Sequence, residues 1–219
     1  MSGLQSIIDS ASKIVFDRRK VVGQTISRSQ RIKSAKRNSA NPLALTVTPS
    51  AYFSYATARD MVEGVMLNDK YTEFQIKLGG TNNTAYLNQY RGALSKAQYS
   101  LMTITNFTLT SVTIGGLPAI GGAITSNTNI LKAGDWIQPY WSRYPYIVTA
   151  DVRRGSGTVA TATVHRNLIT SEATTVTGTI LFGTDTTMQV LIADLPTYEI
   201  GLYKQLSWSG DFQLVEKII

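Results

Sequence analysis

Few side chains in this 219-residue sequence are of the types that perform chemistry. There is no cysteine, which excludes disulfides, thiolate metal sites and a cysteine nucleophile. The single histidine, His165, follows an alternating segment and stands beside Arg166 without an adjacent acidic residue. One histidine excludes a multi-histidine metal site and argues against a Ser-His-Asp triad. We therefore expect no catalytic activity, metal or cofactor, and interpret His165 as a surface or packing residue.

Acidic residues and glycine pairs show no motif of a catalytic or phosphate-binding site. Four aspartates lie near predicted strand ends or turns, namely Asp151, Asp185, Asp194 and Asp211. Aspartate at such positions commonly hydrogen-bonds the local backbone. The glycine pairs within 115–122 lack the context of a nucleotide-binding loop and predict turns.

An aromatic cluster surrounds a polar loop in the second half of the chain. It comprises Trp136, Tyr140, Trp141, Tyr144 and Tyr146. Large amphipathic side chains of this kind bind sugars or protein partners when they are exposed. They also form the core of small domains, with one flank exposed. The sequence leaves both interpretations open.

The formal charge of +7 is concentrated at the N-terminus. Residues 1–40 contain nine basic and two acidic residues, whereas residues 41–219 contain twelve of each. A basic segment neutralises phosphates, docks on an acidic neighbour in an assembly, or is a solvated arm. No aromatic residue for base stacking lies among the basic residues of 28–37.

Strands dominate the predicted elements. Residues 14–16 and 21–27 predict a hairpin around a polar turn at 17–20, and 27–41 predicts a loop or arm. A short helix is expected at 6–12. The clearest helix is 55–67, where Ser54 is the expected N-cap.

Further strands are expected at 43–49, at 71–78 and near the C-terminus at 208–219. The texture changes after Met102, where charge disappears as far as Ile130 and threonine, glycine and asparagine become frequent. Short strands with frequent turns follow, which is typical of a small sandwich or barrel. No apolar run reaches the roughly 18–20 residues of a membrane span, and the first residues do not resemble a secretory signal. We therefore expect a soluble protein without a membrane span.

Several segments together resemble a family of tailed-bacteriophage tail proteins, the distal-tail or baseplate-ring type. These segments are 27–48 (SRSQRIKSAKRNSANPLALTVT), 55–67 (YATARDMVEGVML), 131–138 (LKAGDWIQ), 146–152 (YIVTADV), 157–166, 168–169 and 208–218. The bracketed stretches cover about two-thirds of the chain, and virion structural proteins of marine myoviruses are also similar. The aromatic loop 139–145 (PYWSRYP) and the heavily basic N-terminal region depart from the family pattern.

The resemblance implies a mainly β fold with a tail-tube-like β-sandwich or split barrel, one flanking helix and a small inserted β-barrel or sandwich domain. The ring-forming scaffold would comprise residues 1–101 and 195–219, and the inserted domain residues 102–194. It implies a virion protein, assembled in the host cytoplasm, that forms a ring around the DNA-ejection channel. The ring is commonly a hexamer, and its partners are the tail tube, the hub and other baseplate proteins. DNA only passes through.

We expect the subunit interface in the N-terminal region. Apolar contact is assigned to Ile14, Val15, Phe16, Val21 and Val22, and charge complementarity to Arg18, Arg19, Lys20, Arg28, Arg31, Lys33, Lys36 and Arg37. The alternatives are a carbohydrate- or receptor-binding module that uses the 136–146 aromatic loop, and a nucleic-acid-binding protein that uses residues 13–37.

Overall fold

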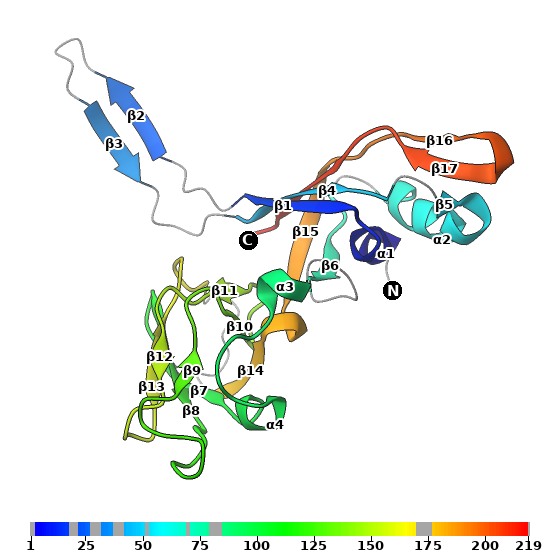
Figure 1. Ribbon diagram of the computed structural model, residues 1–219. Coiled ribbons are helices and arrows are strands. Elements are labelled where there is room, and N and C mark those ends of the chain that lie inside the picture. The colour runs from blue at the N-terminus through cyan, green and yellow to red at the C-terminus, as the bar shows by residue number, and fades with distance from the viewer. Residues whose placement is uncertain are drawn as a thin grey trace.

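The computed structural model describes residues 3–17, 22–26, 32–36, 42–50, 53–68, 71–78, 85–169 and 177–218. Strands dominate these residues, and they form an upper and a lower β unit in Figure 1, with two hairpins projecting from the upper one. The predicted class, mainly β with a sandwich or barrel architecture and a flanking helix, is confirmed.

The upper unit is built on a five-stranded antiparallel sheet in the order β1-β4-β18-β15-β6. The strands are β1 (Lys13–Asp17), β4 (Ala44–Thr48), β18 (Phe212–Glu216), β15 (Thr187–Asp194) and β6 (Phe74–Lys77). Their alternation places Leu45, Val47 and Leu214 in a buried core while intervening residues face outward. The predicted strands at 43–49, 71–78 and the C-terminus are confirmed, with shorter bounds.

Two helices cover this core, α1 (Gly3–Asp9) and α2 (Tyr55–Met66). In α2, Ala58, Val62 and Val65 are buried at helical spacing, and Ser54 precedes the first turn as predicted. The helices cross closely where Gly3 meets Gly64. There is no room for a side chain at this point, since a Cβ at Gly3 would collide with the carbonyl oxygen of Met61. Gly64, a poor helix former, is therefore explained by the close crossing.

The lower unit contains a six-stranded sheet in the order β11-β10-β14-β7-β8-β13 and a separate β12–β9 pair. Its strands are β7 (Thr103–Phe107), β8 (Ser111–Gly115), β9 (Asn129–Leu131), β10 (Trp136–Pro139), β11 (Tyr146–Ile147), β12 (Val152–Arg153), β13 (Ala160–Thr163) and β14 (Gly178–Phe182). Two single-turn helices, α3 (Ala85–Asn88) and α4 (Lys96–Tyr99), precede it. The 3₁₀ turn η1 (Gly183–Asp185) then leads from β14 into β15 of the upper sheet.

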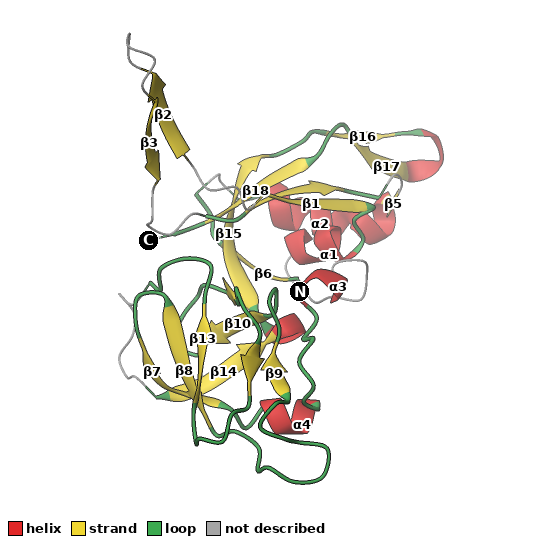
Figure 2. Ribbon diagram, turned by 60° about the vertical axis from the view of Figure 1, so that its left-hand side comes forward, coloured by secondary structure: helices red, strands yellow, loops and turns green. Residues whose placement is uncertain are grey.

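Two hairpins complete the fold. β2 (Val22–Ile26) pairs with β3 (Ile32–Lys36). β16 (Tyr198–Ile200) pairs with β17 (Gln205–Trp208), which also pairs with β5 (Phe53–Ser54), and the 3₁₀ turn η2 (Leu202–Lys204) forms the tip. Figure 2 shows both hairpins extending away from the strands of the upper sheet.

The predicted hairpin between 14–16 and 21–27 is wrong in its pairing. Both strands exist, but β1 pairs with β4, and β2 pairs with β3, which lies in the range predicted as loop. Ile14 and Phe16 pack against the buried core, and β4 supplies the alternating partner that completes this layer. The polar residues 17–20 are compatible with a hairpin turn whichever strand β1 pairs with, so the local sequence does not indicate the long-range pairing.

The predicted boundary of the inserted domain is also corrected by the pairing. β15 lies within 102–194, yet it bonds β18 and β6 of the upper sheet. Conversely, Tyr90, Leu94 and Tyr99, assigned to the scaffold, pack into the core of the lower unit. The long strand β15 continues from the η1 turn into the upper sheet, so the upper sheet resumes at 187 instead of 195.

Candidate functional site

The residues expected at a subunit interface separate into three groups. Ile14 and Phe16 face the protein's own core, where the Phe16 ring meets Trp136 edge-on with centroids 6.0 Å apart. Val15, on the opposite side of β1, is 44% exposed. Ile14 and Phe16 are half-buried and pack against the upper core, so part of each side chain already serves the fold, and their role in a subunit interface stays a prediction.

The remaining interface residues belong to the segment between β1 and β4. Val22, Lys33 and Lys36 lie on β2 and β3. Seven others lie outside the described residues, namely Arg18, Arg19, Lys20, Val21, Arg28, Arg31 and Arg37.

The β2–β3 hairpin, which we call the arm, extends from one end of the upper sheet (Figures 1 and 2). Among the described strands, β2 and β3 pair only with each other. The segment 18–41 that contains the arm carries eight basic and no acidic residues. A lone two-stranded hairpin is marginal in water, so a self-paired, strongly basic hairpin is suited to a partner surface.

The two edges of the upper sheet differ. At β6, the Gln5 side chain of α1 donates to the carbonyl oxygen of Lys77 at 2.8 Å and accepts its N–H at 2.7 Å. An amide side chain thus takes the place of a neighbouring strand at Lys77 and caps that edge at this residue. β1, at the other edge, has no strand on its outer side among the described residues. Sequence patterns do not reveal this difference, because Gln5 and Lys77 are 72 residues apart.

A second projecting feature, at the tip of the β16–β17 hairpin, was missed by the sequence analysis. Leu202 and Tyr203 are 85% and 92% exposed, and Ile200 is 55% exposed. Tyr203 and Lys204 have positive φ values of 64° and 58°, which non-glycine residues rarely adopt. The available signal was an apolar Leu-Tyr pair directly after Gly201 in a polar neighbourhood.

The aromatic cluster does not form the exposed patch considered from the sequence. Trp136, Trp141, Tyr144 and Tyr146 are buried, and only Tyr140 is substantially exposed, at 44%. The Tyr140 ring lies directly over Gly178, where any side chain would collide with it. Four of the five residues are thus packing residues, since Trp136 belongs to the upper core, Tyr144 and Tyr146 belong to the lower core, and Trp141 packs against Phe107.

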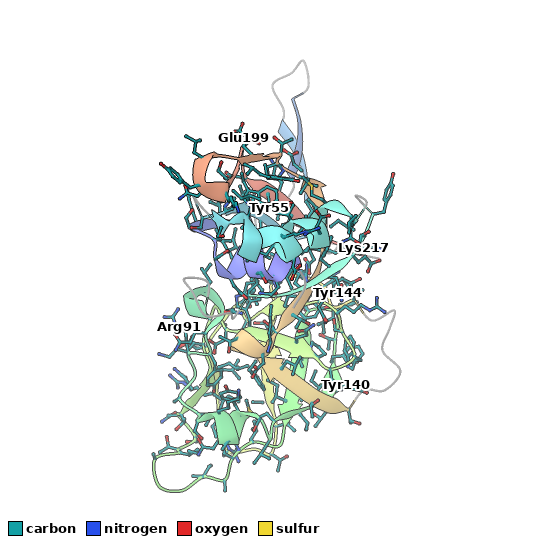
Figure 3. All side chains as sticks on the ribbon, turned by 90° about the vertical axis from the view of Figure 1, so that its right-hand side faces the viewer. Tyr55, Arg91, Tyr140, Tyr144, Glu199 and Lys217 are labelled. Atoms are coloured by element: carbon teal, nitrogen blue, oxygen red, sulfur yellow. The ribbon has the colours of Figure 1, made fainter. Side chains whose placement is uncertain are left out.

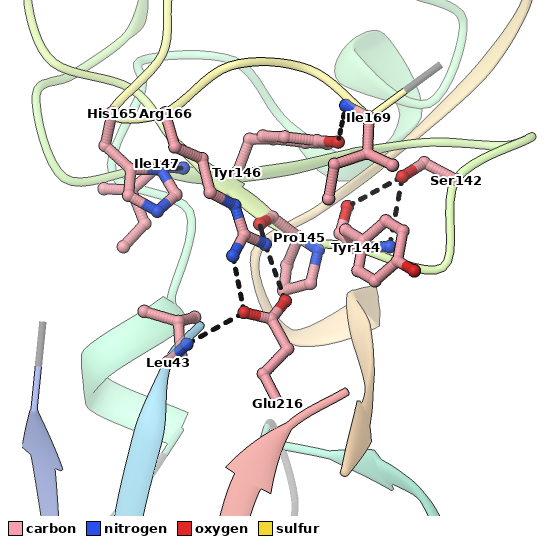
Figure 4. A network of polar contacts seen from close by, with 10 residues as sticks. All are labelled: Leu43, Ser142, Tyr144, Pro145, Tyr146, Ile147, His165, Arg166, Ile169 and Glu216. Carbon is pink, nitrogen blue, oxygen red and sulfur yellow. Dashed lines mark hydrogen bonds and ion pairs between the residues drawn. The ribbon is translucent and has the colours of Figure 1, made fainter. Parts of the chain in front are cut away.

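A buried ion pair joins the two units next to this loop (Figure 4). Arg166 of the lower unit donates to both carboxylate oxygens of Glu216 on β18, at 2.5 and 2.6 Å. It also donates to the carbonyl oxygen of Pro145 at 2.9 Å, and its guanidinium carbon lies 5.2 Å from the centroid of the Tyr146 ring. Glu216 in turn accepts the N–H of Leu43 at 2.9 Å.

Neighbouring polar groups around this pair are held by the backbone. His165 accepts the N–H of Ile147 on Nδ1 at 3.0 Å, which fits the expected packing role. Tyr146 accepts the N–H of Ile169 at 2.9 Å, and burial raises the pKa of its hydroxyl. Figure 4 shows these contacts arranged around Arg166. The arrangement is a structural network that sets the position of the lower unit against β18.

Another buried acid, Asp135, organises the loop before β10. Its carboxylate accepts the N–H of Arg91 at 2.9 Å and that of Lys132 at 2.8 Å. Burial raises the pKa of Asp135 above the usual aspartate range, and the backbone donors oppose this shift. The bond to Arg91 ties a distant segment to this loop and the bond to Lys132 closes a local turn, so we assign Asp135 a structural role.

An open pocket of about 570 Å³ lies at the seam of the two units, beside the loop 139–145. Its lining includes Gln75, Tyr140, Trp141 and Arg143. Gln138 in its wall is already paired, since it accepts the N–H of Thr187 at 2.7 Å and donates to the carbonyl oxygen of Ser142 at 2.9 Å. Among the described residues, the buried indole N–H of Trp141 has no hydrogen-bond partner.

The described part of the chain contains no group of three or more acidic, histidine or cysteine residues arranged to hold a metal ion. None of the helices described is long and apolar enough to cross a membrane.

Comparison of the sequence with models of known protein families finds no match. A search of curated protein sequences likewise finds no significant match.

Proposed function

We propose that this chain is a structural subunit of a phage tail or baseplate, which assembles into a ring around the DNA-ejection channel. The observation that carries the proposal is the arm. It projects from a mainly β scaffold, pairs only with itself among the described strands, and lies in a segment of eight positive charges. The sequence resemblance to distal-tail and baseplate-ring proteins gives the class of assembly and the expected copy number of six.

The difference between the two edges of the upper sheet, β6 and β1, supports an assembly of defined geometry. Gln5 caps the outer edge of β6 at Lys77, whereas β1 and the arm have no further strand partner among the described residues. A protein that blocks one sheet edge limits uncontrolled edge-to-edge association. The remaining contacts would then define a closed oligomer with itself and with the tail tube, hub or other baseplate proteins.

An arm-deleted variant tests this proposal. Asp17 and Ala44 are register partners in β1 and β4, so Asn-Gly can replace residues 18–41 and leave a short loop with Pro42 and Leu43. We expect the full chain to form rings and the variant to remain a folded monomer, measured by mass photometry and circular dichroism. Rings of unchanged size from the variant would show that the arm takes no part in assembly. A full chain that is monomeric alone and forms no ring with its tail-tube partner would refute the proposal.

A second candidate function is carbohydrate or receptor binding at the seam pocket. The specific observation is a pocket lined by Gln75, Tyr140 and Trp141, together with the buried indole N–H of Trp141, which has no hydrogen-bond partner among the described residues. Sugars combine an apolar face for an aromatic ring with hydroxyl acceptors.

Glycan-array binding distinguishes this candidate. The full chain is expected to bind a defined set of glycans, and Trp141→Phe, which keeps a ring but removes the N–H donor, is expected to bind more weakly. Equal binding by both chains, or none by the full chain, would exclude this use of the pocket.

A further inference from the structure

The two projecting hairpins leave the upper sheet at opposite ends. The arm is inserted between β1 and β4 at the end where Asp17 pairs with Ala44. The β16–β17 hairpin is inserted between β15 and β18 at the end where Asp194 pairs with Gln213. β18 runs between these ends, since Val215 pairs with Ala44 and Phe212 with Val47. Figures 1 and 2 show the same opposition.

Charge is also divided between these ends. The end opposite the arm, which we call the acidic end, consists of β5 and α2 (residues 53–68) and the β16–β17 hairpin with its flanks (residues 194–211). It contains five acidic residues, namely Asp60, Glu63, Asp194, Glu199 and Asp211. It contains only two basic residues, Arg59 and Lys204, so its net charge is −3.

The acidic groups are available to a partner. Asp60, Glu199 and Asp211 are exposed and Glu63 is half-buried. Within the described part of the chain, none of these side chains forms an ion pair. Figure 3, in which Glu199 is labelled on the β16–β17 hairpin, looks toward this end of the molecule.

An apolar anchor accompanies the charge. Leu202 and Tyr203 are almost fully exposed at the hairpin tip, in backbone that is partly left-handed. Exposed apolar side chains with a polar rim are typical of protein-binding surfaces, and strained backbone clusters at functional sites.

We infer that the acidic end is the docking surface for the arm of a second copy of this chain, an inference that rests on the proposed function. A segment of charge +8 at one end and a surface of charge −3 at the other give each copy one donor and one acceptor half of a head-to-tail contact. Contacts of this heterologous type close into rings when the rotation per subunit allows it. Complementary charge sets the register and raises the association rate.

Charge reversal of each half provides the test. One variant combines Asp60→Lys, Glu63→Lys, Glu199→Lys and Asp211→Lys, and the other combines Arg28→Glu, Arg31→Glu, Lys33→Glu and Lys36→Glu. Each is expected to weaken self-association by more than about tenfold, measured by mass photometry at low ionic strength. A control adds four lysines on exposed loops of the lower unit, at Ala119, Ala123, Ser126 and Asn127, and is expected to assemble normally.

Mixing the two variants gives the sharper result. Each retains the half that the other lacks, and the introduced glutamates of one variant oppose the introduced lysines of the other, so the mixture is expected to regain association in complexes that contain both variants, detected by native mass spectrometry. If only the arm variant fails to assemble, the arm docks elsewhere and the inference is wrong. If both variants form normal rings, the inference is wrong while the proposed ring function stands. A full chain that never associates, alone or with a tail-tube partner, refutes both.

Discussion

Replacing Glu216 with glutamine leaves the positive charge of Arg166 buried without its counter-ion. Arg166 and Glu216 are only 5% and 2% exposed, so water does not reach the guanidinium to compensate. The glutamine amide group also meets either the Leu43 N–H or an Arg166 N–H, donor against donor. Breaking a buried pair in this way costs about 3–5 kcal/mol.

Arg166→Met is expected to cost a similar amount. It removes two charge-assisted hydrogen bonds to Glu216, one bond to the Pro145 carbonyl oxygen and the contact of the guanidinium with the Tyr146 ring. It leaves the Glu216 carboxylate buried, with the Leu43 N–H as its remaining donor.

The double variant Arg166→Met with Glu216→Gln distinguishes an ion pair from two independent packing residues. Without the guanidinium, the glutamine oxygen can accept the Leu43 N–H and no unpaired charge remains. We expect its loss of stability to be smaller than the sum of the single losses by at least about 2 kcal/mol.

Urea unfolding at neutral pH, followed by tryptophan fluorescence, measures these free energies. Single losses below about 1 kcal/mol, or additive losses in the double variant, would show that the pair does not stabilise the contact between the two units.

Three further predictions follow from buried or edge contacts. Asp135→Asn is expected to cost about 1–3 kcal/mol, because one of two backbone N–H groups loses its acceptor. Burial raises the pKa of Asp135 in the folded state, so its contribution to the free energy of unfolding is complete below the ordinary pKa of about 3.9 and declines as pH rises through the raised pKa. The difference in the free energy of unfolding between the unmodified chain and Asp135→Asn should therefore narrow with rising pH. A difference that widens in pH-dependent urea unfolding would contradict this. Tyr146→Phe is expected to cost about 1–2 kcal/mol at neutral pH, because the Ile169 N–H loses its acceptor. The difference in the free energy of unfolding between the unmodified chain and Tyr146→Phe should narrow above pH of about 10, because only the unfolded tyrosine ionises there. A difference that stays constant in alkaline urea titrations would argue against this prediction. Gln5→Ala should cost about 1–2 kcal/mol and increase nonspecific association through β6, read by thermal unfolding and light scattering, whereas Gln5→Glu should cost at least as much, because its carboxylate meets the Lys77 carbonyl oxygen and the Asp9 carboxylate.

Local pattern predicted the elements whose burial is periodic. Residues 44–48 alternate between buried and half-buried positions, and 55–66 bury every third or fourth residue, so period alone identifies β4 and α2. β18 was identified for the same reason, since Phe212 and Leu214 face the core together.

Pairing between distant strands was beyond local pattern. β1 reads equally well as half of a hairpin with 22–26 or as the partner of β4, and the choice depends on the core that Ile14 and Phe16 complete. The β2–β3 pairing was missed because residues 32–36 are polar and basic, without the alternation of a half-buried strand.

The candidate sites were predicted only in part. The charge of the arm is visible in composition, but its acceptor surface combines residues 53–68 with 194–211, which only the fold brings together. The aromatic cluster was found, whereas its burial depends on packing against distant segments, as in the contacts of Trp136 with Phe16 and of Trp141 with Phe107.

Native mass spectrometry of the full chain, alone and mixed with its tail-tube partner, tests the central proposal most directly. A ring subunit that assembles through its arm predicts a closed oligomer, with six copies expected, which disappears when Asn-Gly replaces residues 18–41. A full chain that remains monomeric under both conditions would contradict the proposal.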